Sequence, residues 1–280
     1  MGAPGVEVEA RTAGSRGLVP PPWDEDPLGR PDGSAERVPD DQPIVITIDG
    51  PAGTGKSTVA RRLADRLGLD FLDTGAMYRA ATAIIIDENL DLADVDAVVE
   101  RVASADLHFD WSRDPPVVMA WFRPLDHRIR DDDVTRMVSR VAGYGPLRRH
   151  MVRKQQIIAH QHPRLVTEGR DQGSVVFPSA PMKFYLDAAP QIRARRRADQ
   201  LREMGRDADE ARLLREIIER DRSDSERTDG PLVCPADAVR IDTGHMSVEE
   251  VVATLERRSR ERLGDRLQAA VGAPRRGRSG

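Results

Sequence analysis

A short apolar segment at residues 43–49 is the first regular pattern along the chain. Its sequence, PIVITID, is rich in β-branched side chains and runs directly into a glycine-rich turn, as buried parallel strands do. In the next stretch, STVARRLADRLG, apolar side chains from Val59 to Leu67 recur at helical spacing, and Gly68 supplies a C-terminal stop. The pattern predicts a strand, a tight turn and a helix.

Four more short apolar segments are predicted to be strands of the same sheet. One or more stretches with helical periodicity separate each strand from the next, which is the alternation of a parallel sheet joined by crossover helices. The pattern therefore predicts an α/β fold of three layers, with a five-stranded, mostly parallel sheet covered on both faces. The four segments are DFLD (70–73), RLVTEG (164–169), MKFYLD (182–187) and AVRID (238–242).

Residues 106–162 interrupt this alternation. LHFDW and PVVMAWF, within 107–122, have the composition of two paired antiparallel strands, and the helical stretches VTRMVSRVAG and GPLRRHMVRKQQIIAHQ follow them. We interpret this segment as an insertion beside the edge of the sheet where ligands bind in such folds.

The two ends of the chain lack this periodicity. Residues 1–42 are rich in Gly, Pro, Asp, Glu and Arg, and residues 266–280 include the basic run PRRGRSG. Segments of this composition bury too little apolar surface to fold. We expect a disordered extension (1–42), a folded domain (43–265) and a flexible tail (266–280).

Composition narrows the classes of function. The net charge is −4 and the chain has one cysteine, Cys234, so neither a global basic field for nucleic acid nor a disulfide framework is expected. The sequence has no run of 18 apolar residues and no apolar signal-peptide core. We expect a cytoplasmic protein without membrane or nucleic-acid partners, because basic runs such as RARRRAD are too short to outweigh the acidic balance.

The glycine-rich turn after the first strand carries the most specific chemical signal. GPAGTGKST fits the pattern G-x-x-x-x-G-K-[ST] between a strand and a helix, and such a loop points several backbone N–H groups at one anion. We expect Lys56 to contact the transferred phosphate and Ser57 to ligate Mg²⁺. The chain has no NKxD-like sequence that would read guanine, which favours ATP over GTP. The predicted nucleotide-binding residues of this loop are Gly50, Pro51, Ala52, Gly53, Thr54, Gly55, Lys56, Ser57 and Thr58.

A second set of polar residues follows the second strand. Asp73, Thr74 and Arg79 lie in the segment LDTGAMYR. The carboxyl end of this strand faces the same crevice as the phosphate loop, so Arg79 can hold the phosphate of an acceptor. A phosphate loop by itself indicates only that a nucleoside triphosphate is bound, so the acceptor has to be inferred from other residues. The alternative is that Arg79 is a solvated helix residue.

Four segments, in this order, resemble the bacterial cytidylate kinases: GPAGTGKST, LDTGAMYR, EGRDQGSVVFPSA and ERDRSDSERTDGPL. The resemblance runs from about residue 43 to 264, and the insertion falls where that family carries its CMP-binding domain. It implies phosphate transfer from ATP to CMP and dCMP, with an inserted nucleoside-monophosphate-binding domain and a short lid at about 193–210. We expect a monomer whose partners are the nucleotides ATP, CMP and dCMP, with Mg²⁺ as the metal.

The resemblance also assigns roles to individual residues. Lys56, Arg79 and Arg170 would act on the phosphates, and the two arginines would grip the phosphate of CMP through paired hydrogen bonds. Thr74 keeps a hydroxyl at a position where the family commonly has serine. For the rest of the acceptor, Ser139, Arg148 and Asp171 match the positions that read the cytosine edge, and Arg220, Asp224 and Arg227 match those that contact ribose and base.

The spacing of the last three positions supports their grouping independently. They stand at i, i+4 and i+7, so one helical face can direct an Arg, an Asp and an Arg toward one point. A surface ladder of ion pairs is the alternative interpretation.

Two positions complete the predicted site, and a third departs from the resemblance. Arg196, in the arginine-rich run 193–197, is expected to pack near the adenine or the phosphates of ATP. Glu168, at the end of the third strand, would orient Mg²⁺ through water beside Ser57. Gln172 stands where an apolar residue is usual.

Two other kinds of function stay open at the level of the sequence. A kinase for shikimate or for another nucleoside monophosphate would share the phosphate loop, although not the combined GRD and RDRSDSER segments. A non-enzymatic switch module would bind ATP without releasing ADP in response to an acceptor.

Overall fold

The computed structural model of the chain describes residues 43–268, which all belong to one compact unit. The predicted disordered extension (1–42) and residues 269–280 of the predicted tail lie outside the described residues. The chain continues in helical form past the predicted end of the domain, as α9 (Asp265–Gln268), in which Leu267 is buried.

Five parallel strands form the central sheet, as the sequence predicts. Their order is β2-β6-β1-β7-β8, and every neighbouring pair in this sheet runs parallel. All residues of the central strand β1 are buried, which accounts for its continuous apolar character. The strands are β1 (Ile44–Asp49), β2 (Asp70–Asp73), β6 (Arg164–Glu168), β7 (Met182–Asp187) and β8 (Val239–Asp242).

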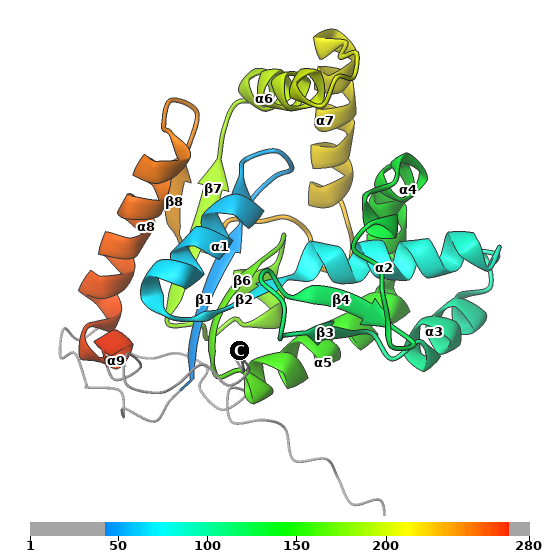
Figure 1. The fold of residues 1–280 in the computed structure, drawn as a ribbon, viewed down its shortest axis with the longest axis horizontal. Coiled ribbons are helices and arrows are strands. Elements are labelled where there is room, and N and C mark those ends of the chain that lie inside the picture. Colours follow the sequence, from blue (N-terminus) through cyan, green and yellow to red (C-terminus); the bar gives the residue numbers. More distant parts are fainter. Residues whose placement is uncertain (1–42, 269–280) are drawn as a thin grey trace, which may run out of the picture. The chain divides into compact units, whose positions relative to one another are not determined.

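Side chains of the sheet alternate between two faces and build two hydrophobic cores. Ile44, Ile46 and Ile48 of β1 pack in one core, while Val45 of the same strand packs in the other. The three-layer arrangement is confirmed, and Figure 1 shows α1 and α8 on one side of the sheet and α2 on the other. The covering helices are α1 (Lys56–Leu67) and α8 (Val248–Leu263) on the first face, and α2 (Thr74–Asp87) and α5 (Gly145–Gln161) on the second.

The insertion contains a three-stranded antiparallel sheet where the sequence suggested two strands. β3 (His108–Asp110) pairs with β4 (Val117–Ala120), and β4 pairs with β5 (Arg123–Pro124). The apolar run PVVMAWF had indicated one strand through Phe122. The strand ends earlier because Trp121 and Phe122 form a turn with φ of 46° and 59°. Positive φ at both central residues is typical of a two-residue type I′ hairpin turn, and aromatic residues do not signal such a turn.

Helices around the insertion share one core with the α2 face of the sheet. Val98 and Val102 of α3 pack in the same cluster as Val138 of α4 and Phe109 of β3. The insertion is therefore packed against α2 through a continuous apolar core. These elements are α3 (Val95–Ser104), the 3-10 turn η1 (Arg128–Arg130) and α4 (Asp132–Ala142).

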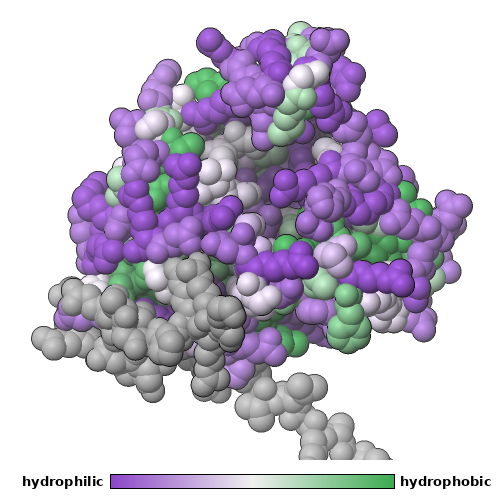
Figure 2. All heavy atoms as spheres, in the orientation of Figure 1, coloured by the Kyte–Doolittle hydropathy of each residue, from purple (hydrophilic) through white to green (hydrophobic). Residues whose placement is uncertain are grey.

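Two helices that pack against each other stand above the carboxyl ends of the strands. They are α6 (Pro190–Glu203) and α7 (Glu210–Ser225), and the predicted lid at 193–210 covers most of α6 and the turn into α7. In Figures 1 and 2 these helices lie at the top, and hydrophilic residues cover them. A π-helical turn, η2 (Gln172–Val176), follows β6. Within residues 43–268, no helix has the length and apolar character needed to cross a bilayer.

Candidate active site

The phosphate loop connects β1 to α1 and depends on glycine at its sharpest points. Gly53 and Gly55 have φ of 81° and 86°, a region that residues with a side chain rarely adopt. A Cβ on Gly50 would lie 2.0 Å from the carbonyl oxygen of Leu186 in β7. The first turn of α1 has no side-chain cap, so its free N–H groups can meet an anion.

Lys56 is buried beneath this loop. Its Nζ donates to the carbonyl oxygen of Pro51 at 2.8 Å, beside a Thr54 hydroxyl that donates to the same oxygen at 3.1 Å. Burial, followed by the charge of Arg170, lowers the pKa of Lys56 to about 7. A phosphate at the loop would favour the charged form of this amine.

Oxygen atoms meet beside Lys56 at the ends of β2 and β6. The Ser57 hydroxyl donates to Glu168 Oε1 at 2.7 Å, and Asp73 pairs with Glu168 in the sheet register. Burial and the neighbouring Glu168 raise the pKa of Asp73 to about 7. Sequence reasoning missed Asp73 as part of this set, although its place at a strand end was a signal.

A single pocket contains every residue that the sequence assigned to the acceptor. Its walls come from α2, α4, α5, the turn after β6, and the end of α7. The lining residues are Thr74, Gly75, Tyr78, Arg79, Val138, Ser139, Ala142, Arg148, Glu168, Gly169, Arg170, Asp171, Arg220, Asp224 and Arg227. We call this pocket the acceptor pocket. It adjoins the phosphate loop, because Glu168 lines the pocket and accepts a hydrogen bond from Ser57 of the loop.

Arg79, Arg170 and Arg220 all line the acceptor pocket. Arg170 Nε donates to Asp224 Oδ2 at 2.8 Å, and Arg79 Nη1 donates to the Thr135 hydroxyl at 2.9 Å. Among the described residues, Arg220 Nε has no hydrogen-bond partner, and burial together with Arg170 lowers its pKa to about 10. The arginines disfavour one another's charge, so a bound anion would stabilise the cluster.

Asp224 is the buried carboxylate among these arginines. Burial opposes ionisation of this carboxyl group, but Arg170 and Arg227 outweigh it and hold its pKa below the ordinary value. Arg227 Nε donates to the carbonyl oxygen of Asp224 at 3.2 Å. The predicted helical face includes Arg220 and Asp224, whereas Arg227 lies beyond the end of α7 at Ser225 and reaches the pocket from the following turn.

Ser139, Arg148 and Asp171 line the same pocket. Arg148 Nη2 donates to Asp171, and its Nη1 donates to the carbonyl oxygen of Ala142 at 3.0 Å. The guanidinium lies over the ring of Tyr78, 5.5 Å from its centroid. Burial raises the pKa of Tyr78 to about 12, so this hydroxyl stays protonated. Tyr78 is a pocket residue that the sequence reasoning did not select.

Buried hydrogen bonds fix the segment that carries Arg170 and Asp171. Asp49, at the end of β1, accepts from the backbone N–H of Gln172 at 2.8 Å and of Gly173 at 2.7 Å. The Gln172 side chain accepts from the Thr167 hydroxyl at 2.9 Å and donates to Gln155 of α5 at 3.0 Å. Gln172, at a position where an apolar residue was expected, is therefore buried with its side-chain amide hydrogen-bonded on both sides. Its two bonds link β6 to α5, the helix that carries Arg148.

Thr74 and Arg196 are hydrogen-bonded to backbone carbonyl groups of the protein. The Thr74 hydroxyl donates to the carbonyl oxygen of Glu168 at 2.7 Å. Arg196 Nη2 donates to the carbonyl oxygen of Thr243 at 2.5 Å, and so holds the loop after β8 beside α6. Within the same arginine-rich run, Arg193 is buried against the phosphate loop.

Comparisons with known proteins agree with this geometry. A family model described as cytidylate kinase matches residues 46–261. The chain belongs to the cytidylate kinase family. The cytidylate kinase of Methylococcus capsulatus is 43% identical over 208 residues, which cover 74% of this chain and 93% of that protein. The cytidylate kinase of Corynebacterium efficiens is 43% identical over 214 residues, covering 76% of this chain and 92% of that protein.

The cytidylate kinase of Mycobacterium leprae is 41% identical over 221 residues, covering 79% of this chain and 97% of that protein. Among solved structures, a gluconokinase from Sinorhizobium meliloti 1021 has a TM-score of 0.41 and 16% identity, covering 78% of this chain and 95% of that chain. The family match spans both the phosphate loop and the acceptor pocket.

Proposed function

We propose that this chain transfers the terminal phosphate of ATP to CMP and dCMP, forming ADP and CDP or dCDP. The observation that carries the proposal is the junction of two anion sites. The phosphate loop ends at Ser57, which bonds to Glu168, and Glu168 lines the pocket that contains Arg79, Arg170 and Arg220. A donor and an acceptor phosphate can therefore meet at one place.

Phosphoryl transfer depends mainly on the positions of the donor and acceptor phosphates and on the neutralisation of their negative charge. Phosphoryl transfer needs two anions brought into line, and their repulsion must be offset at the transition state. Lys56 and the N–H groups of the phosphate loop hold the donor, while Arg79 and Arg170 hold the acceptor phosphate. No residue has to form a covalent bond to the transferred group.

The base wall suits cytosine. The Asp171 carboxylate accepts hydrogen bonds and can take one from the 4-amino group, while Arg148 can donate to the ring nitrogen or the carbonyl oxygen. Uracil presents a carbonyl in place of that amino group, so Asp171 would face an acceptor with no proton to share. Leaving such a buried group unpaired costs about 1–3 kcal/mol, which supports a preference for CMP and dCMP.

The oxygen atoms beside the phosphate loop fit Mg²⁺. Ser57, Glu168 and Asp73 supply hydroxyl and carboxylate oxygens, the ligands that this cation prefers. Within the described residues, no group of three His, Cys, Asp or Glu is placed to hold a metal ion. Ser57 would hold Mg²⁺ directly and Glu168 through water, and the ion would supply positive charge beside the phosphates of ATP.

Closure of the insertion (106–162) and of the lid (193–210) would exclude water from the transfer site. An open pocket would allow water to compete with CMP as the phosphate acceptor. The acceptor pocket is suited to such closure because α4, α5 and α7 each contribute walls to it.

Acceptor-dependent ADP release tests the proposal. ATP and Mg²⁺ are supplied with each nucleoside monophosphate in turn, and wild type is compared with Lys56→Ala. We expect strong stimulation by CMP and dCMP in wild type and very little in the variant. Stimulation by a different acceptor would be consistent with the kinase mechanism, but it would contradict the proposal that Ser139, Arg148 and Asp171 recognise cytosine. Tight ATP binding with no stimulation would indicate a switch module.

A further inference from the structure

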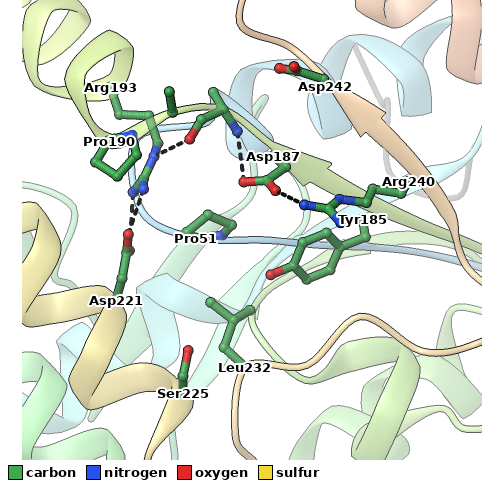
Figure 3. Close-up of a pocket in the computed structure, with 12 residues that line it drawn as sticks. Pro51, Tyr185, Asp187, Pro190, Arg193, Asp221, Ser225, Leu232, Arg240 and Asp242 are labelled. Atoms are coloured by element: carbon green, nitrogen blue, oxygen red, sulfur yellow. Dashed lines mark hydrogen bonds and ion pairs between the residues drawn. The ribbon is translucent and has the colours of Figure 1, made fainter.

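Arg193 of α6 is an arginine buried between the phosphate loop and α7. Its exposed fraction is 2%, and each of its side-chain nitrogens has a partner. Nε donates to the carbonyl oxygen of Ala188 at 2.8 Å, and Nη1 donates to the carbonyl oxygen of Ala52 at 2.9 Å. Both terminal nitrogens bond to the carboxylate of Asp221, with Nη2 at 2.5 Å. Figure 3 shows this guanidinium pointing at Asp221, beside Pro51 of the loop.

The contact with Ala52 fixes the direction of one peptide unit in the phosphate loop. In a trans peptide the carbonyl and the following N–H point in opposite directions. Because Arg193 holds the carbonyl of Ala52, the N–H of Gly53 is directed away from the guanidinium. The Cβ of Arg193 also lies 3.3 Å from where a Cβ on Gly53 would stand, so the side chain packs directly against the loop.

Asp221 connects Arg193 to α7, the helix that contributes residues to the acceptor pocket. It lies on α7 directly after Arg220 and one turn before Asp224, and both of those residues line the acceptor pocket. Asp221 also lies close enough to Arg170 and Arg220 to favour their protonated forms. The same helix therefore contacts the acceptor on one side and, through Asp221 and Arg193, the phosphate loop on the other.

We propose that Arg193 and Asp221 are positioning residues that couple acceptor binding to the shape of the phosphate loop. An acceptor that engages Arg220 and Asp224 orders α7, which holds Asp221 against Arg193. Arg193 in turn keeps the Gly53 N–H aimed at the donor phosphates. This inference rests on the proposed function for the identity of the acceptor, but the contact with Gly53 does not depend on it.

Two variants remove the coupling while keeping the size of the side chains. Arg193→Lys keeps a positive charge but cannot reach Ala52, Ala188 and Asp221 at once, and Asp221→Asn removes the charge on α7. Asp199→Asn is the matched control, because Asp199 forms an exposed ion pair with Arg202 on the same helix as Arg193. Thermal unfolding of each variant identifies any general loss of stability.

The first measurement follows the Gly53 amide by NMR in protein bound to a non-hydrolysable ATP analogue. We expect a strong downfield shift of this amide in wild type and in Asp199→Asn, and its loss in Arg193→Lys. An unchanged shift in folded Arg193→Lys would overturn the positioning role. This readout requires neither turnover nor CMP.

The second measurement is the affinity for the same analogue with and without CMP. Wild type should bind the analogue about fivefold or more tightly when CMP is present, an ordinary size for coupling between sites. Both variants should lose most of this ratio and about tenfold in kcat, with the affinity for CMP alone nearly unchanged. Unchanged ratios in both variants would overturn the coupling. Absence of CMP phosphorylation by wild type would instead refute the proposed function, and the Gly53 shift would still decide the role of Arg193.

Discussion

At the scale of single residues, the candidate site is distinguished by positively charged side chains that are buried away from solvent. Lys56 and Arg220 both have lowered pKa values because burial opposes their charge. Phosphate groups are the natural counter-ions for such cations, and a bound phosphate would favour the charged forms that burial disfavours. The burial of these two cations therefore favours the binding of an anion.

Proton uptake by Lys56 follows from its pKa of about 7. Bound ATP should raise this pKa, so Lys56 should take up a proton when ATP binds at pH values above 7. The affinity for ATP should therefore fall as the pH rises through that window. Calorimetry without Mg²⁺, in two buffers of different ionisation enthalpy, counts the protons. Lys56→Arg keeps its charge throughout and is the control. Equal uptake in wild type and in this variant would contradict the assignment.

Arg79→Ala separates acceptor use from donor binding. A charged hydrogen bond to phosphate is worth about 1.5–3 kcal/mol, so KM for CMP should rise by about ten- to hundredfold. ATP affinity should change much less, because Arg79 lines the acceptor pocket. Steady-state kinetics and analogue binding measure the two effects. Arg136→Ala, on the exposed side of α4, should leave both unchanged, whereas equal losses of CMP use and ATP affinity in Arg79→Ala would refute its role.

At the scale of elements, the segment after α7 closes the base wall of the pocket. Gly230 has φ of 61°, and a Cβ there would lie 2.2 Å from Arg148 Nη2 and 2.4 Å from Asp171 Oδ2. The loop between α7 and β8 therefore lies directly on Arg148 and Asp171, the pair that we propose to read the base. No motif in the sequence indicated this contact, because it joins positions far apart along the chain.

Gly230→Ala should disturb recognition of the acceptor base. The added methyl group must displace Arg148 or Asp171, so KM for CMP should rise by about tenfold or more while ATP affinity stays close to wild type. Gly205→Ala is the matched control, because Gly205 has φ of 72° with no atom within 4 Å of the added Cβ. Both variants place alanine at a positive φ, which costs about 1–2 kcal/mol in each. A similar KM in the two variants would show that the base wall tolerates the displacement.

The sequence predicted the elements whose pattern lies within a short stretch of residues. It did not predict contacts between residues that are far apart along the chain. The strand, loop and helix around Lys56 follow from adjacent residues, and the GRD segment places Arg170 and Asp171 together. The bond from Asp49 to the N–H of Gln172 spans 123 positions, and periodicity carries no information about it. The turn at Trp121 was missed because its residues are apolar rather than typical of turns.

At the scale of the whole molecule, the proposed closure would involve several elements at once. The acceptor pocket draws walls from α2, α4, α5 and α7, and the phosphate loop is tied to α6 through Arg193. We expect CMP and a non-hydrolysable ATP analogue together to reduce the radius of gyration in small-angle scattering more than either ligand alone. An unchanged radius with both ligands bound would contradict closure.

The most direct test of phosphate transfer to cytidine nucleotides is a competition in one tube. ATP and Mg²⁺ are mixed with equal amounts of CMP, dCMP, UMP and AMP, and the diphosphates are separated by chromatography at early times. We expect CDP and dCDP to form first, with the ADP formed from ATP equal to their sum, because the phosphate passes to the acceptor and not to water. Early UDP, or ADP without a matching cytidine diphosphate, would contradict the assigned reaction.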